Sequence, residues 1–177
     1  MKSKVRVLYY LLFLVMLTPG VKSSAQLATV SANAQVFAEV IPVFAAVETA
    51  QLNFGRFAPG PYGGEIILTP QSTISVLGSI YVGTGVHNAA SFYLSGDADA
   101  SFSVSLPVNP VILRHASTAK TLLVDSWRSV PAPGTGTGML KNGYQTVYIG
   151  ATLKVGTLDD NPVGVYTGSY QVTFDFN

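Results

Sequence analysis

Cysteine is absent from the chain, and only 11% of its 177 residues are charged, compared with about 25% in an ordinary soluble domain. Without cysteine, the chain has no disulfide framework, no thiolate metal site and no lipid-modified N-terminal cysteine. Threonine, serine, glycine and tyrosine take the place of charged side chains, so the solubility of the protein depends on hydroxyl groups and backbone. Its stability must therefore come from apolar burial and from hydrogen bonding between strands.

The patterns that usually mark catalysis, phosphate binding or metal binding are also missing. His87 and His115 have no Asp, Glu or Cys at ligand spacing, and both are expected at the surface or in loops. The glycine-rich residues 134–138 lack the Gly-Lys-Ser/Thr of a phosphate loop, and residues 159–161 lack the ligand ladder of a calcium loop. Neither G-x-S-x-G nor H-E-x-x-H occurs. The sequence thus predicts a non-enzymatic protein with no catalytic residue, no cofactor and no metal site.

The first 25 residues have the organisation of a secretory signal peptide. Three basic residues within the first six positions precede an apolar run at 7–17, and a Thr-Pro-Gly break and the small residues before Ala25 follow. The apolar run is shorter than the roughly 20 residues that a membrane span requires. We expect cleavage near Ala25 and a secreted protein, in the periplasm or at the cell surface, whose mature chain of residues 26–177 contains no membrane span.

Cleavage also changes the charge of the protein. It removes four of the ten Lys and Arg residues, leaving six against all nine Asp and Glu residues, so the formal net charge changes from +1 to −3. Nucleic acid, whose binding relies on Lys and Arg contacts to phosphates, is therefore not an expected partner. The remaining 152 residues suit a single domain with a sizeable core.

A two-residue hydrophobic period recurs along the mature chain, and this period is typical of strands. No stretch has a sustained helical period flanked by capping residues. Gly- and Pro-rich turns separate the short apolar runs, and residues 131–138 are expected to form a mobile loop. The sequence predicts an all-β, antiparallel β-sandwich of the immunoglobulin-like type. Its expected strands are residues 43–47, 52–57, 65–69, 73–82, 91–95, 101–106, 111–113, 121–127 and 144–155.

The C-terminal stretch, residues 163–177, has the most regular amphipathic alternation. We expect it to be a core strand that pairs antiparallel with residues 144–155. Its first tyrosines are also reminiscent of the tyrosine corner of immunoglobulin-like domains. No later strand follows in this sequence, so we expect another segment to lie beside its free edge. The side chains expected to form its core face are Tyr166, Tyr170, Val172, Phe174 and Phe176.

The start of the mature chain alternates in the same way. Residues 26–41 are expected to form a strand, which Pro42 ends because proline cannot donate to a strand ladder. Two arrangements fit this pattern: the strand is donated to a neighbouring subunit, or it folds back as an edge strand of its own sheet. In either case, the buried face consists of Ala28, Val30, Ala32, Ala34, Val36, Ala38 and Val40.

Three segments together resemble a family of secreted bacterial proteins that is recorded as a domain of unknown function. They are L-N-F-G at 52–55, Gly-Gly at 63–64 with the strand and Thr-Pro that follow it, and G-V-Y-T-G-S-Y-Q-V-T-F at 164–174. That family is similar to spore coat protein U and to the subunits of chaperone-usher pili. The resemblance implies a pilin-like fold, an incomplete immunoglobulin-like sandwich whose groove is filled by the N-terminal strand of a neighbour. Many of those relatives carry a disulfide, which this chain lacks.

Two functions stay open at this point. In the first, the protein is a structural subunit of a surface filament or coat that associates with itself or with related subunits by strand addition, and a periplasmic chaperone is a further candidate partner. In the second, it is a self-contained secreted module that binds a glycan or a protein through Tyr62, Tyr81, Trp127 and Tyr144. These four side chains could equally pack within the strands. The position of the N-terminal run discriminates between the two functions.

We predict that the protein leaves the cytoplasm and that the mature chain begins at Gln26, because Ala25 ends the expected signal peptide. Mass spectrometry of the protein recovered from outside the cytoplasm measures its N-terminal residue. Recovery of a chain that still begins at Met1 would contradict this prediction.

Overall fold

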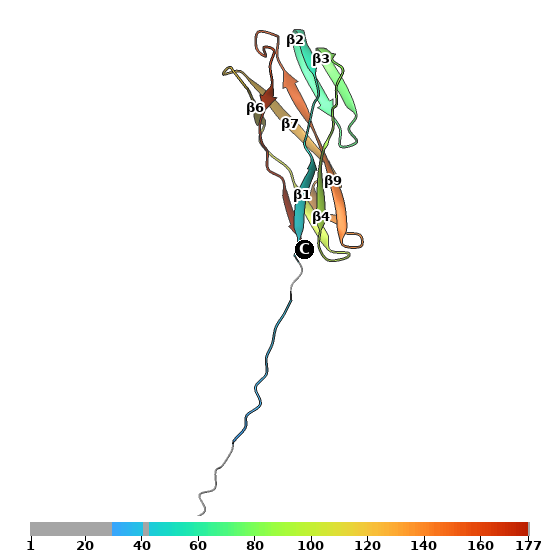
Figure 1. Ribbon diagram of the computed structural model, residues 1–177. Helices are drawn as coiled ribbons and strands as arrows, with labels where there is room; N and C mark the ends of the chain where they lie inside the picture. The colour runs from blue at the N-terminus through green and yellow to red at the C-terminus, as the bar shows by residue number, and fades with distance from the viewer. Residues whose placement is uncertain (1–29, 41–42, 177) are drawn as a thin grey trace, which may run out of the picture. The chain divides into compact units, whose positions relative to one another are not determined.

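The computed structural model describes residues 30–40 and 43–176 of the chain (Figure 1). The chain divides into two compact units, residues 1–39 and residues 40–177, and each is described by itself. The expected signal peptide, and Ala28 of the N-terminal run, lie outside the described residues.

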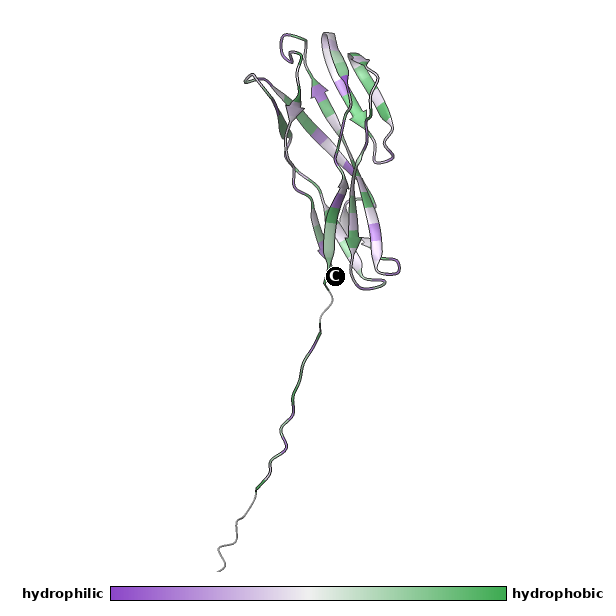
Figure 2. Cartoon of the chain, viewed as in Figure 1, coloured by the Kyte–Doolittle hydropathy of each residue, from purple (hydrophilic) through white to green (hydrophobic). Residues whose placement is uncertain are grey.

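The described residues form strands and no helix, and all strand pairs are antiparallel. The predicted all-β, antiparallel fold is therefore confirmed. Figure 2 shows bands of hydrophobic and hydrophilic residues along the strands, as expected for strands with one buried face. The strands are β1 (Ala45–Ala50), β2 (Phe57–Leu68), β3 (Ile74–Val82), β4 (Ala90–Ser95), β5 (Ser101–Ser105), β6 (Val111–His115), β7 (Thr121–Val130), β8 (Gly134–Met139), β9 (Tyr144–Val155), β10 (Tyr166–Thr167) and β11 (Thr173–Phe176).

Two sheets build the domain. In the larger sheet the strands follow the order β1-β4-β9-β7-β6-β10, and β2 pairs with both β9 and β3. The smaller sheet has the order β11-β5-β8. One hydrophobic cluster contains residues of both sheets, because Leu94 of β4 and Ile149 of β9 pack with Phe102 and Val104 of β5. Two sheets that share a core in this way are consistent with a β-sandwich.

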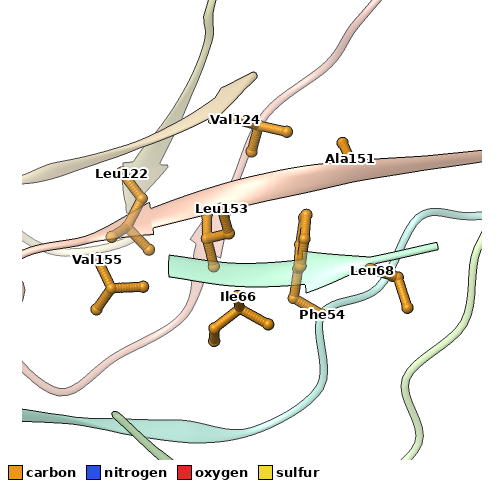
Figure 3. Packing of buried hydrophobic residues seen from close by; sticks show 8 residues of the cluster. All are labelled: Phe54, Ile66, Leu68, Leu122, Val124, Ala151, Leu153 and Val155. Carbon is orange, nitrogen blue, oxygen red and sulfur yellow. The ribbon is translucent and has the colours of Figure 1, made fainter. Parts of the chain in front are cut away.

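β9 is the central strand of the larger sheet (Figure 1). On one edge it pairs with β4 and then with β2, and on the other edge it pairs with β7. Its buried face supplies side chains to both hydrophobic clusters of the domain. Figure 3 shows the first of these clusters, which gathers Phe54, Ile66, Leu68, Leu122, Val124, Ala151, Leu153 and Val155.

The expected pairing of residues 144–155 with the C-terminal strand is wrong. β4, β2 and β7 occupy both edges of β9, so no edge is left for the C-terminal stretch. β10 pairs instead with β6, and β11 pairs with β5 in the smaller sheet. The C-terminal stretch thus forms two short strands, and residues 168–172 between them have no strand assignment.

Residues 131–138, expected to form a mobile loop, contain most of β8. This strand pairs with β5, where Phe102 lies opposite Gly138. The Phe102 ring is fully buried against Gly138, and a Cβ at Gly138 would overlap the ring. Glycine here allows a close approach of a side chain to the backbone, which is a packing role rather than a sign of mobility.

The Gly- and Pro-rich residues 59–64, between two of the expected strands, lie within β2 and do not form a separate turn. The pairing of β2 with β3 moves from Pro59↔Ile80 to Gly64↔Gly78, so residues 60–63 face only residue 79. This bulge is possible because Gly63 and Gly78 adopt positive φ angles of 63° and 89°, which side chains with a Cβ rarely adopt. The loop signals in the sequence therefore mark an interruption of one strand rather than its end.

We predict that Phe174→Asp strongly destabilises the domain. The Phe174 ring packs against Phe92 and Phe102, with centroids 5.6 Å and 6.5 Å away, so the change would place an unpaired carboxylate among aromatic rings. The free energy of unfolding should fall by roughly 3 kcal/mol or more. Thr173→Asp is the matched control, because Thr173 is exposed, and its effect should stay below about 1 kcal/mol. Urea denaturation measures both changes, and equal losses would contradict the assignment of the two faces.

Candidate functional site: an apolar groove beside the C-terminal strands

A groove with a volume of about 1030 Å³ opens between two segments that are far apart in the sequence. One wall is formed by residues 51–59 and the other by residues 161–172. Its floor belongs to the buried sheet face, and the floor residues Leu122, Val124 and Leu153 are seen with Phe54 of the first wall in Figure 3. These floor side chains are themselves buried, so the groove lies directly over the hydrophobic core.

Neither wall of the groove is a continuous paired strand. On residues 51–56, the assigned strand pairing is limited to an isolated bridge between Asn53 and Asn88. On the opposite wall, residues 168–172 have no strand assignment. Backbone groups along an unpaired edge can form a ladder with an added strand. Both walls thus have the backbone arrangement that strand addition requires.

An aromatic stack, outside the residues that line the groove, links the start of β1 to the end of the C-terminal stretch. Phe44, directly before β1, stacks on Phe176 of β11 with ring centroids 4.3 Å apart and an interplanar angle of 19°. Gly96 makes room for this stack, because a Cβ at that position would overlap the Phe44 ring. The stack joins the edge strand of the larger sheet to the edge strand of the smaller sheet.

Hydrogen bonds fix the wall at the opposite end. The Tyr166 hydroxyl donates to the carbonyl oxygen of Pro162, four residues earlier, at 2.9 Å, which is the geometry of a tyrosine corner. Burial raises the pKa of Tyr166, and its hydrogen bond with Asn161 opposes this effect. The buried Asn161 side chain also donates to the carbonyl oxygen of Thr121 at 2.9 Å, which ties the wall to β7.

His115 holds the same wall from β6. Its Nδ1 accepts hydrogen bonds from the backbone N–H groups of Ser117 and Thr118, at 3.0 Å and 3.1 Å. The proton of the neutral ring must therefore be on Nε2, which donates to the carbonyl oxygen of Val163 at 3.1 Å. His115 was expected at the surface or in a loop, but it lies half-buried on a strand and has a structural role.

Trp127 and Tyr170 face each other in the middle of the groove. Their ring centroids are 4.6 Å apart, and Trp127 contacts both hydrophobic clusters. The indole Nε1 of Trp127 and the hydroxyl of Tyr170 are buried, and within the described residues neither has a hydrogen-bond partner. Burial raises the pKa of Tyr170, and the negative charge of Glu48 adds to this effect. The groove is lined by polar as well as apolar side chains, among them Glu48 and Arg56.

The five core residues predicted for the C-terminal stretch share one half-buried face, while the side chains between them are exposed. Tyr166, Tyr170 and Val172 line the groove. Phe174 and Phe176 pack beyond it against the cluster that both sheets share. The face is half-buried rather than fully buried because the groove beside it is open.

The N-terminal run is described from residue 30 onward, as part of a single chain. Residues 30–40 carry no strand, and all of their side chains are exposed. Val36 and Val40 expose 96% and 95% of their surface. The residues predicted for the apolar face of the run that are exposed here are Val30, Ala32, Ala34, Val36, Ala38 and Val40.

The four aromatic residues considered for ligand binding do not form one site. Tyr62, Tyr81 and Tyr144 are exposed on β2, β3 and β9, whereas Trp127 is half-buried in the groove. Tyr144 stacks with Tyr93 of β4 at a centroid distance of 6.2 Å. The wall at residues 51–59 was not predicted from the sequence. The L-N-F-G motif lies in this wall, and its Phe54 side chain is buried.

The paired charges of the domain lie outside the groove. Lys154 Nζ donates to Glu65 Oε1 at 2.5 Å and lies 3.8 Å from Asp125 Oδ1. The hydrogen bond that Lys154 donates to Glu65 raises the pKa of Lys154. In residues 30–40 and 43–176, no group of three or more His, Asp or Glu side chains could hold a metal ion. The same part of the chain contains no helix long and apolar enough to cross a membrane.

One family model, described as a domain of unknown function (DUF4402), matches residues 44–176. No curated protein and no solved structure matches the chain. The matched range begins and ends at the two stacked rings, Phe44 and Phe176. It contains the whole groove, and the N-terminal run lies before it.

We predict that Tyr166→Phe destabilises the domain, because the change removes the hydrogen bond to Pro162 while the ring is kept. The expected loss in the free energy of unfolding is about 1–2 kcal/mol. Tyr81→Phe is the matched control, because the Tyr81 side chain is 69% exposed. This change should alter the free energy of unfolding by no more than about 0.5 kcal/mol. Urea denaturation of both variants tests this, and an unchanged midpoint for Tyr166→Phe would show that the corner does not fix the wall.

Proposed function

We propose that this chain, which belongs to the DUF4402 family, is a non-enzymatic structural subunit of a secreted filament or coat. In this proposal, the N-terminal run of one copy, residues 28–40, inserts as a strand into the groove of the next copy. The domain is then pilin-like, and its sandwich is completed by a neighbour.

The open groove is the observation that carries the proposal. It is lined by half-buried apolar side chains such as Leu52, Leu113 and Trp127, between two walls that lack continuous strand pairing, so an added strand would both cover apolar surface and pair with the walls. Its walls come from the segment between β1 and β2 and from the C-terminal stretch, and the tyrosine corner of Tyr166 supports an immunoglobulin-like arrangement of these parts.

The N-terminal run has the properties of a suitable insert. Its exposed valines would each gain about 1.5–3 kcal/mol on full burial. Residues 28–38 carry no charge, and Glu39, the one charged residue of the insert, alternates with the valines and so lies on the opposite face. Thirteen extended residues, 28–40, span about 43 Å, which is enough to follow a wall of about ten residues.

The mass of the protein in solution distinguishes insertion into a neighbour from insertion into the same domain, because a run that fills its own groove leaves a monomer.

A second candidate function is ligand binding by the exposed tyrosines. Tyr93 and Tyr144 stack side by side on adjacent strands, and Tyr148 is exposed on the same face of β9. Aromatic rings that combine an apolar face with a hydroxyl group suit recognition of a glycan or a protein surface. This candidate requires no self-association, so the oligomeric state of the protein separates it from the first.

We predict that the full mature chain self-associates and that Val36→Asp abolishes association, because Val36 lies on the apolar face of the insert. Gln35→Asp places the same charge on the opposite face and should associate like the wild type. Size-exclusion chromatography with light scattering measures the mass of each form.

A synthetic peptide of residues 28–40 provides the matching competition experiment. An excess of this peptide should fill the groove and convert assemblies of the full mature chain to monomers, whereas the same peptide with Asp at position 36 should not. A wild type that remains monomeric at high concentration and does not bind the peptide would contradict the proposal and favour the ligand-binding module.

A further inference from the structure

Two charged side chains line the groove on the side of its first wall. Glu48 belongs to β1, and Arg56 lies directly before β2. The pairing of β1 with β4 and the bridge between Asn53 and Asn88 keep the chain extended between the two charges. Eight extended residues span up to about 26 Å, so this side of the groove has a negative charge toward one end and a positive charge toward the other.

The Arg56 side chain is exposed at the rim of the groove and lacks an ionic partner. Gly55 has a positive φ angle of 79°, which interrupts the alternation of the wall. Phe54 therefore lies in the first hydrophobic cluster and Phe57 packs against it, while Arg56 between them is exposed. In residues 30–40 and 43–176 the ion pairs all involve Lys154, so the guanidinium of Arg56 has no carboxylate partner there.

The N-terminal run carries one charge that complements Arg56. Glu39 is the only charged residue among residues 28–40, and its side chain is exposed. It alternates with the residues of the apolar face, so in an inserted strand it would point away from the floor and toward the rim. Because Glu39 lies next to the C-terminal end of the run, it can reach only one end of the groove, and the direction of the insert decides which end.

We propose that Glu39 of one copy forms an ion pair with Arg56 of the copy that receives its strand, and that this pair fixes the direction of the insert. Ser31, eight residues before Glu39, then lies near Glu48, and the inserted strand runs in the same direction as the wall. The reverse direction would bring Glu39 toward the like charge of Glu48, which is unfavourable. This inference rests on the proposed function, because it assigns the direction and the charge specificity of the same insertion.

Charge reversal at either residue should weaken self-association of the full mature chain. Arg56→Glu and Glu39→Arg each replace an attraction by a repulsion, so the dissociation constant should rise about three- to tenfold. The variant with both changes pairs the charges in the opposite sense and should return to within about twofold of the wild type. Sedimentation at a series of concentrations measures the dissociation constant of each form.

Arg128→Glu is the matched control for the change in net charge. Arg128 is exposed on β7 and does not line the groove, so its reversal should change the dissociation constant by less than about twofold. At about 1 M salt the difference between wild type and Arg56→Glu should shrink, because charges at an exposed rim are screened. The urea midpoint of monomeric Arg56→Glu should equal that of the wild type, since Arg56 is exposed and forms no ion pair in the described part of the chain.

Cross-linking tests the direction of the insert, because the chain has no cysteine of its own. The mature chain with Glu39→Cys and Arg56→Cys, treated with a short bismaleimide well above its dissociation constant, should give a ladder of covalent oligomers on a denaturing gel. Glu39→Cys with Glu48→Cys is the matched control. It should give no more covalent oligomer than Glu39→Cys alone, because in the proposed direction these positions lie toward opposite ends of the wall.

Three outcomes overturn the inference. They are an effect of Arg56→Glu no larger than that of Arg128→Glu, a double reversal that associates no more tightly than the single variants, and cross-linking between copies at positions 39 and 48 but not at 39 and 56. In each case the wild type still associates, so the proposed function stands. A wild type that neither associates nor binds the 28–40 peptide overturns the function and this inference together.

Discussion

Pairing on both edges of β9 is the constraint on which the rest of the structure depends. β4 and β2 share one edge and β7 takes the other, while the buried face of β9 contributes to both hydrophobic clusters. A strand that is fully paired cannot accept the C-terminal stretch, whose short strands instead bond to β6 and to β5. The C-terminal stretch therefore crosses from one sheet to the other and leaves its middle, residues 168–172, without a strand partner.

The groove is a consequence of that crossing. Residues 51–56 follow the edge strand β1 with a single isolated bridge, so two segments without continuous pairing face each other across the groove. The N-terminal run has apolar side chains at alternate positions, and residues 30–40 have no strand assignment. In the proposed assembly, each part supplies what the other lacks.

Local alternation predicted the strands well, and the residues expected at 73–82, 91–95 and 144–155 lie within one position of β3, β4 and β9. Strand partners were not predictable in the same way, because pairing depends on which edges other segments have already taken. Gly138 looked like a loop residue because the sequence does not show that Phe102 packs against it. The two walls of the groove are more than a hundred positions apart, so the sequence carries no local signal for the groove.

The Phe44–Phe176 stack has a mechanical consequence. In a filament held together by inserted N-terminal runs, tension on a subunit reaches the domain at Phe44, where the run joins β1. Antiparallel hydrogen bonds lie perpendicular to their strands, so a pull along β1 loads its five paired positions with β4 together rather than one after another. The stack adds the C-terminal strand β11 to the same anchor, and the load is thereby shared between both sheets of the sandwich.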